Sequence, residues 1–181
     1  MDDFSADNFD HGPHGFVGGG YLQIQVVSGA PIGFHPTPKG TPGWGAEWKK
    51  AVKRYYNHAA NITITGSAQP WRGGYLSLDP TYKDAWGLPL LRVTYDFPDN
   101  DIRMSAFLTE RGDEIGRAMK GVTQTEPGPR KRPFSATVYQ STHLTGGAAM
   151  GSDPATSVVN RYGQSWDVPN VFVTGAALFP Q

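Results

Sequence analysis

Cysteine is absent from the 181 residues of this chain, and neither sign of charge is in excess. Without cysteine the chain cannot form a disulfide, a zinc–thiolate site or a thiol nucleophile. Basic and acidic residues number 16 each, so the formal net charge is zero and the basic surface of a nucleic-acid binder is missing. No segment approaches the about 18 apolar residues that a membrane-spanning helix needs. These absences argue against a nucleic-acid partner and against a direct membrane span.

Glycine and proline are frequent instead, with 23 and 15 residues, and aromatic residues make up 12% of the chain. This composition is typical of a folded protein with many turns, because low-complexity disordered chains are richer in glycine and proline. The first residues are acidic and lack the apolar centre of a signal peptide. The sequence ends at residues 179–181, directly after an apolar strand and without a polar tail, which indicates a fragment.

The periodicity of apolar residues predicts both strands and helices. Strands are expected at 21–27, 61–66, 75–78, 90–95, 134–140 and 170–174, with a loop at 79–87. Helices are expected at 44–58 and at 100–119, although Gly112 and Gly116 weaken the second. Because the strands cluster and do not alternate strictly with helices, the sequence predicts an α+β fold. We expect a mainly antiparallel sheet with both helices packed on it.

The most informative stretch is 141–154, where His143 ends a predicted strand and precedes a glycine-rich turn. The pKa of a histidine side chain lets it take up and release a proton near neutrality. Gly146, Gly147 and Gly151 lack the Cβ atom that would keep the backbone away from a planar ligand. Taken alone, however, a single histidine at a strand end is usually structural, and a glycine-rich turn is usually only a turn.

The segment 139–181 resembles the C-terminal region of the glucose–methanol–choline (GMC) flavoenzymes. The matching residues are S-T-H-L-x-G-G-x-x-M-G-x-D-P at 141–154, S-V-V-N-R-Y at 157–162, Q-S-W-D-V-P-N-V-F-V-T-G-A at 164–176 and F-P at 179–180. Within the family the chain is most similar to the branch of gluconate, fructose and sorbitol dehydrogenase flavoprotein subunits. Weaker similarity to that branch extends to 7–11 and 70–74.

The resemblance implies an FAD-dependent oxidoreductase acting on the CH–OH group of a sugar, sugar acid or polyol. In the family, the histidine matching His143 lies over the flavin and removes the hydroxyl proton, and the carbon-bound hydrogen leaves as hydride. The backbone matching Gly146, Gly147, Gly175 and Ala176 is expected to bind the cofactor. The branch also implies a cytochrome c subunit and a small subunit as partners. Its members are often periplasmic and associated with the membrane through those partners.

Two departures from the family pattern bear on these implications. The dinucleotide fingerprint Gly-x-Gly-x-x-Gly is absent, and Gly18-Gly19-Gly20 precedes a strand where the fingerprint follows one. The family's second catalytic residue, histidine or asparagine, lies beyond the Phe-Pro pair. We therefore expect 1–138 to be a partial substrate-binding (cap) domain and 139–181 to complete the active site and the FAD domain. This polypeptide alone is expected to be inactive.

Two other functions compete with this interpretation. The chain could be a non-catalytic binding or structural remnant of such an enzyme, which an upstream Gly-x-Gly-x-x-Gly unit would argue against. It could also be a carbohydrate-binding module with aromatic platforms. Trp44 and Trp48, at helical spacing, favour a core over such a platform. Trp71 and Trp86, in predicted loops, are better candidates for lining a polyol pocket.

Several polar residues have simpler interpretations than a site. His11 and His14, near acidic residues, suggest metal ligands but are far more typical of a loop. His58 is most simply a surface residue. Asp153 before Pro154 is expected to shape a turn. Asn160 is expected to hydrogen-bond the backbone of the loop that follows it.

Overall fold

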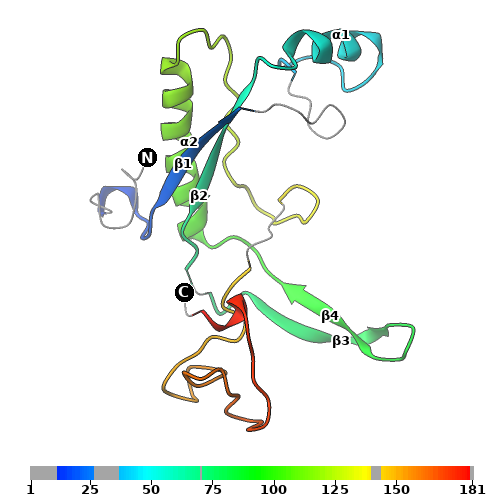
Figure 1. Cartoon of the computed structure of the whole chain (residues 1–181), viewed down its shortest axis with the longest axis vertical. Coiled ribbons are helices and arrows are strands. Elements are labelled where there is room, and N and C mark those ends of the chain that lie inside the picture. Colours follow the sequence, from blue (N-terminus) through cyan, green and yellow to red (C-terminus); the bar gives the residue numbers. More distant parts are fainter. Residues whose placement is uncertain (1–11, 27–36, 70, 140–143, 180–181) are drawn as a thin grey trace. The chain divides into compact units, whose positions relative to one another are not determined.

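The structure, a computed structural model, describes residues 12–26, 37–69, 71–139 and 144–179. The chain divides into two compact units (Figure 1). The first comprises Met1–Ser67 and Asn100–Arg130, and the second comprises Ala68–Asp99 and Lys131–Gln181. Helices and antiparallel strands occur together, so the predicted α+β fold is confirmed. The second unit includes residues on both sides of the expected boundary at 138, and the division into a cap domain and a motif region stays a prediction.

In the first unit, β1 (Gly20–Val26) and β2 (Ala60–Gly66) form a two-stranded antiparallel sheet. The register pairs Leu22 with Ile64, and the alternation of apolar and polar residues therefore gives this sheet one apolar face. The helix α2 (Asp99–Ala118) packs on that face, as Figure 1 shows. A short 3₁₀ helix, η1 (Gly12–His14), precedes β1.

The core of the first unit lies between α2 and the two strands. Its buried residues are Phe16, Leu22, Met104 and Leu108, with Ile62, Ile64, Phe107 and Ile115 packed against them. Gly112 is buried on α2, and a Cβ atom there would lie 3.3 Å from Leu22 Cδ2. The glycine that weakens the helix in the sequence is thus the residue that lets the helix approach the strands closely.

The helix expected at 44–58 is confirmed as α1 (Gly45–Tyr55), but its predicted packing on the sheet is wrong. None of its residues is buried, and the Trp44 side chain before it is 85% exposed. The prediction of Trp44 as a core residue is therefore wrong for this chain. An amphipathic pattern is enough to form a helix, whereas burial needs an apolar partner supplied by another part of the fold.

The second unit contains a separate antiparallel sheet of β3 (Tyr75–Lys83) and β4 (Pro89–Thr94). The single sheet that the sequence predicts is therefore wrong, because β1–β2 and β3–β4 do not pair with each other. The loop expected at 79–87 is shorter, since β3 continues to Lys83. The turn is closed by Asp84, whose Oδ1 accepts hydrogen bonds of 2.9 Å from the backbone N–H groups of Trp86 and Leu88.

Two predicted strands are absent from the described residues. At 134–139 the chain turns, with the backbone N–H groups of Val138 and Tyr139 both donating to the Ser135 carbonyl. At 170–174 a single bridge joins Phe172 to Gln164. The chain then forms a short 3₁₀ helix, η2 (Ala176–Leu178). Alternating apolar residues suit a strand, but a strand also requires a continuous ladder of backbone hydrogen bonds. Among the described residues, 171–173 pair only with the short segment 163–165, so this pairing stays an isolated bridge.

Among the helices of the described residues, none is long and apolar enough to cross a membrane.

Candidate functional site

The glycine-rich segment after His143 is held along η2 by backbone hydrogen bonds. The N–H group of Gly146 donates to the Ala176 carbonyl at 3.3 Å, and that of Ala148 donates to the Ala177 carbonyl at 2.9 Å. Met150 continues the series with a 3.0 Å bond to the Leu178 carbonyl. The structure therefore joins two stretches that lie about thirty residues apart in the sequence.

The short loops within residues 151–173 support this junction. Val159 is completely buried, and its carbonyl accepts a 3.0 Å bond from the N–H group of Gly151. Gly163 is buried at φ +76°, and a Cβ atom there would lie 2.7 Å from the Val173 carbonyl oxygen. Val159 and Gly163 were not singled out in the sequence. The turn-forming residues around Gly163 are a sequence pattern that predicts a tight turn at this position.

Two of the predicted cofactor-binding residues, Gly147 and Gly175, face open space. A Cβ atom at either position would have no neighbour within 4 Å. Gly175 also has φ +89°, a conformation that residues with a side chain rarely adopt. The structure thus brings Gly146 and Ala176 together and leaves bare backbone beside them at Gly147 and Gly175.

His143, the predicted catalytic base, lies outside the described residues, as do the other residues of 140–143. The described residues before this segment are well anchored. The Tyr139 ring lies edge-on to Phe97, with 5.0 Å between ring centroids, and its hydroxyl accepts a 2.8 Å bond from the backbone N–H of Lys131. After the segment, Gly146 is bonded to Ala176. The chain is therefore held on both sides of the predicted base.

The rings around Tyr139 form one aromatic cluster, which consists of Tyr95, Phe97, Phe134 and Tyr139. Phe97 is buried at its centre. Arg132 fixes the backbone beside the cluster, because its Nε donates to the Phe97 carbonyl at 2.6 Å and its Nη1 lies 2.6 Å from Asp99 Oδ1. The cluster thus joins the end of the β3–β4 region to the chain that leads into the motif.

Two structural interpretations from the sequence are confirmed inside the motif. Asp153 Oδ1 accepts a 2.9 Å bond from the backbone N–H of Ala155, which closes a turn. Asn160 Oδ1 accepts bonds from the backbone N–H groups of Tyr162 and Gln164 at 2.9 and 3.2 Å. Both side chains are thus engaged in holding the loops.

Residues 70–181 match the GMC oxidoreductase family over more than half of the chain. The chain belongs to the GMC oxidoreductase family. The resemblance recognised in the 141–176 motifs is thereby confirmed. The match also covers the β3–β4 sheet and the aromatic cluster.

Curated relatives of this GMC chain include three dehydrogenases. It is 54% identical to the gluconate 2-dehydrogenase flavoprotein of Pantoea cypripedii, over all of this chain and 30% of that protein. It is 33% identical to the 2-methyl-1,2-propanediol dehydrogenase of Mycolicibacterium austroafricanum, over 92% of this chain and 30% of that protein. It is 33% identical to the fructose dehydrogenase large subunit of Gluconobacter japonicus, over 74% of this chain and 23% of that protein. The similarity to the gluconate and fructose dehydrogenase branch is therefore confirmed, and the GMC chain spans less than a third of the length of these relatives.

The tryptophans expected to line a polyol pocket are largely exposed in the GMC chain. Trp86, at the turn between β3 and β4, is 85% exposed. Trp71 is 55% exposed, and its indole lies against the backbone of Gly73. The role of both tryptophans in substrate binding stays a prediction.

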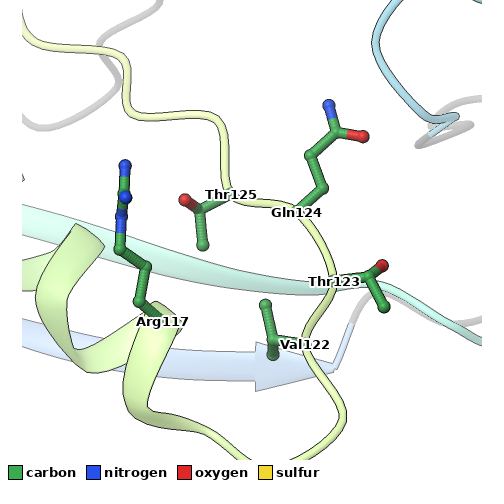
Figure 2. A pocket seen from close by; sticks show the side chains of 5 residues that line it. All are labelled: Arg117, Val122, Thr123, Gln124 and Thr125. Carbon is green, nitrogen blue, oxygen red and sulfur yellow. The ribbon is translucent and has the colours of Figure 1, made fainter.

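A hollow of about 300 Å³ lies at the end of α2 (Figure 2). Figure 2 shows that its lining side chains come from the last turn of α2 and the connector that follows. They are Arg117, Val122, Thr123, Gln124 and Thr125. Among the described residues predicted for the active site, Gly146, Gly147, Gly175 and Ala176, none lines this hollow.

Among the described residues, three carboxyl groups have shifted pKa values, and all three lie outside the 144–179 motif of the GMC chain. Hydrogen bonds from the backbone N–H groups of Tyr82 and Thr81 hold the pKa of Asp79 below its ordinary value, and the bond from Tyr82 has the larger effect. Burial raises the pKa of Asp101. A hydrogen bond with the Thr125 side chain lowers the pKa of Asp113. None of the three carboxyl groups belongs to the predicted site.

The described histidines do not form a metal centre. His14 packs against Phe107, with 4.4 Å between ring centroids, and His58 is exposed, as expected of a surface residue. Within the described ranges, no group of three or more histidine, aspartate or glutamate side chains could hold a metal ion. His11 lies outside the described residues.

Proposed function

We propose that this chain is the substrate-side part of an FAD-dependent oxidoreductase that acts on the CH–OH group of a sugar, sugar acid or polyol. The observation that carries the proposal is the junction of the glycine-rich segment with η2. It places two of the residues matched to the family's cofactor-binding backbone, Gly146 and Ala176, in direct hydrogen-bond contact. Membership in the GMC oxidoreductase family supports the same reaction class.

His143 is the proposed base, and its role is to accept the proton of the substrate hydroxyl. A positioned base accelerates such a step by about 10²–10⁴-fold, provided that its imidazole is held in reach of the proton. The anchoring of Tyr139 before it and of Gly146 after it supports this role, because the described chain is hydrogen-bonded on both sides of the proposed base. The proton then occupies the imidazole until solvent removes it.

The residues present fit a planar cofactor. Gly147 and Gly175 have open space where a side chain would otherwise stand, and neither has a Cβ atom to hold a ring away. We propose that these two glycines, with Gly146 and Ala176, would hold FAD by backbone contact. When bound, FAD supplies the acceptor for the hydride that leaves the alcohol carbon.

The relatives support a proposal for the substrate class. The gluconate 2-dehydrogenase flavoprotein is 54% identical over this whole chain, more than the propanediol and fructose dehydrogenases at 33%. We therefore propose a sugar acid of the gluconate type as the first substrate to assay, with polyols and ketoses next. A cytochrome c subunit and a small subunit are the proposed partners, since the related fructose dehydrogenase protein is itself a large subunit.

The test uses the full-length enzyme and its His143→Ala variant. We expect flavin reduction by substrate to slow by about 10²–10⁴-fold while the FAD content stays near that of the wild type. Stopped-flow absorbance of the flavin measures the first quantity, and the flavin-to-protein absorbance ratio measures the second.

His58→Ala is the matched control, because His58 is exposed and lies outside the motif. It should leave both quantities unchanged. A His143→Ala enzyme that reduces its flavin within a few-fold of the wild-type rate would show that His143 is a structural histidine. Loss of FAD from the variant would instead assign it to cofactor anchoring.

A further inference from the structure

The turn at 159–164 is hydrogen-bonded to both of the segments that carry the proposed cofactor contacts. At the start of the turn, the Val159 carbonyl accepts a 3.0 Å bond from the N–H group of Gly151, at the end of the glycine-rich segment. Near the end of the turn, the Gly163 carbonyl accepts a 2.8 Å bond from the N–H group of Val173, shortly before η2. The conformation of this turn therefore influences how the two segments lie relative to each other.

Asn160 closes this turn with its side chain and with its backbone. Its Oδ1 atom accepts hydrogen bonds from the backbone N–H groups of Tyr162 and Gln164 at 2.9 and 3.2 Å. Its carbonyl accepts a 2.9 Å bond from the N–H group of Gly163, and its own N–H group donates to the Gln164 carbonyl at 2.9 Å. An asparagine side chain that bonds the backbone ahead of it holds the chain in a tight turn.

A second side chain extends the hold of Asn160 to the segment before η2. Asn160 Nδ2 donates a 3.1 Å bond to Gln164 Oε1, and Gln164 Nε2 donates a 2.8 Å bond to the Pro169 carbonyl. Both residues are partly buried, and hydrogen bonds that are shielded from water are stronger than exposed ones. The two side chains thus link the turn to the 169–173 segment in addition to the backbone bonds.

We propose that Asn160 is a positioning residue for the cofactor, because it fixes the turn that holds the backbone of Gly147 and Gly175 in place. This inference rests on the proposed function, in which both glycines would contact FAD. No atom lies within 4 Å of the place where a side chain would stand at either glycine, so neither is held by packing there. A binding site tolerates displacements of only about 0.5 Å, and Asn160 would act on it through the turn, without touching FAD itself.

Asp84 provides a matched control, because its side chain closes a turn in the same way outside the 144–179 motif. Its Oδ1 atom accepts bonds from the backbone N–H groups of Trp86 and Leu88, two and four residues further along. The two bonds to Asn160 Oδ1 have the same spacing in the sequence. Alanine at either position should therefore disturb its own turn to a similar degree, and only Asn160→Ala should affect the cofactor.

The first measurement is hydrogen exchange in the full-length enzyme. Mass spectrometry with fragmentation of the peptide that spans 169–179 follows the amide of Val173, whose acceptor is the Gly163 carbonyl. We expect this amide to exchange about ten-fold faster in Asn160→Ala, because the turn that presents the acceptor has lost its side-chain bonds. Asp84→Ala should leave the exchange of this peptide unchanged.

The second measurement is the reduction of the flavin by substrate, expressed per bound flavin and followed by stopped-flow absorbance. We expect the limiting rate to fall about ten-fold in Asn160→Ala and the apparent Kd of the substrate to change much less, because the backbone that would hold FAD is displaced. Asp84→Ala should leave the limiting rate unchanged. Asn160→Asp keeps the Oδ1 acceptor and should restore most of both the exchange protection and the rate.

Gln164→Glu is a second, milder variant, which keeps the backbone of the turn and loses the side-chain bond to the Pro169 carbonyl. It should change both measurements in the same direction as Asn160→Ala, by a smaller factor. If Asn160→Ala does not yield folded enzyme, Gln164→Glu and Asn160→Asp decide the question.

Two outcomes would overturn the proposal. Unchanged exchange at Val173 in the Asn160 and Gln164 variants would show that the turn does not depend on these side chains. Faster exchange with a wild-type rate of flavin reduction would show that Asn160 stabilises the loop alone. The exchange measurement does not depend on flavin chemistry, so a failure of the proposed function, such as normal flavin reduction in His143→Ala, is distinguishable from a failure of this inference.

Discussion

At the scale of single residues, short polar side chains close the turns of this protein. Asp84, Asp153 and Asn160 each accept hydrogen bonds from backbone N–H groups two to four residues further along. The roles of Asp153 and Asn160 are predictable from the sequence, because these side chains reach only nearby backbone. Asp79 does the same inside β3, and its position there was expected to be a loop.

The first prediction concerns the titration of Asp79. The N–H groups of Tyr82 and Thr81 each lie 2.8 Å from its Oδ1 and lower its pKa from the ordinary value of 3.8. A carboxyl group whose pKa is lower in the folded state than in the unfolded state stabilises the fold at pH values above its unfolded-state pKa. This stabilisation is lost as the pH falls through its folded-state pKa. We therefore expect a carboxyl NMR titration midpoint below 3.8 for Asp79.

The control is Asp79→Asn, whose stability should fall less than that of the wild type as the pH is lowered through the window between the two pKa values of Asp79, because only the contribution of that carboxyl group is removed. A titration midpoint at or above 3.8 in the folded protein would contradict the prediction.

At the scale of elements, the contact between α2 and the β1–β2 sheet depends on size as much as on hydrophobicity. Leu108 is 1% exposed in the core, while Gly112, one turn further along, allows the helix to lie close to Leu22. The sequence shows the apolar stripe of α2, which places Leu108 correctly. It does not show why Gly112 is a glycine, because the side chains beside it come from strands more than forty residues away.

The second prediction concerns Leu108. Leu108→Ala removes a buried side chain and leaves a cavity, so we expect the free energy of unfolding to fall by about 2–5 kcal/mol. Leu91→Ala is the control, because Leu91 is 63% exposed in this chain. Its effect should stay within about 0.5 kcal/mol.

Urea unfolding of the 181-residue variants, followed by circular dichroism, measures both changes. Equal effects of the two substitutions would mean that the Leu108 side chain is not part of a well-packed core in solution.

At the scale of the whole molecule, the chain lacks the glycine-rich sequence that typically binds the phosphates of a dinucleotide cofactor. The Gly-x-Gly-x-x-Gly turn is absent from the sequence, and that turn with its helix N-terminus provides the main contacts to a dinucleotide pyrophosphate. We therefore expect the purified 181-residue chain not to retain FAD tightly.

The measurement is the flavin absorbance of the chain after mixing with FAD and gel filtration, with the full-length enzyme as the positive control. A stoichiometric yellow protein from the 181-residue chain would contradict the prediction, and it would place the main FAD site within these residues.

The sequence by itself determined the family, the α+β class and the approximate bounds of α1, α2 and four of the strands. Family motifs such as those at 141–176 are strings of neighbouring residues. Helix periodicity and turn-closing aspartates likewise involve residues only a few positions apart. His143, Gly147 and Gly175 were also proposed from these motifs, and their catalytic and cofactor-binding roles stay predictions.

Only the tertiary structure decided which strands pair, which apolar residues are buried and which backbone groups meet. It separated the expected single sheet into two, exposed Trp44, and joined Gly146 to Ala176 across the motif. The predicted strands at 134–140 and 170–174 are absent from the described residues, where no continuous ladder of hydrogen bonds to another strand forms. Strand pairing and burial depend on partners that are distant in the sequence, and no local pattern states which distant partner will be available.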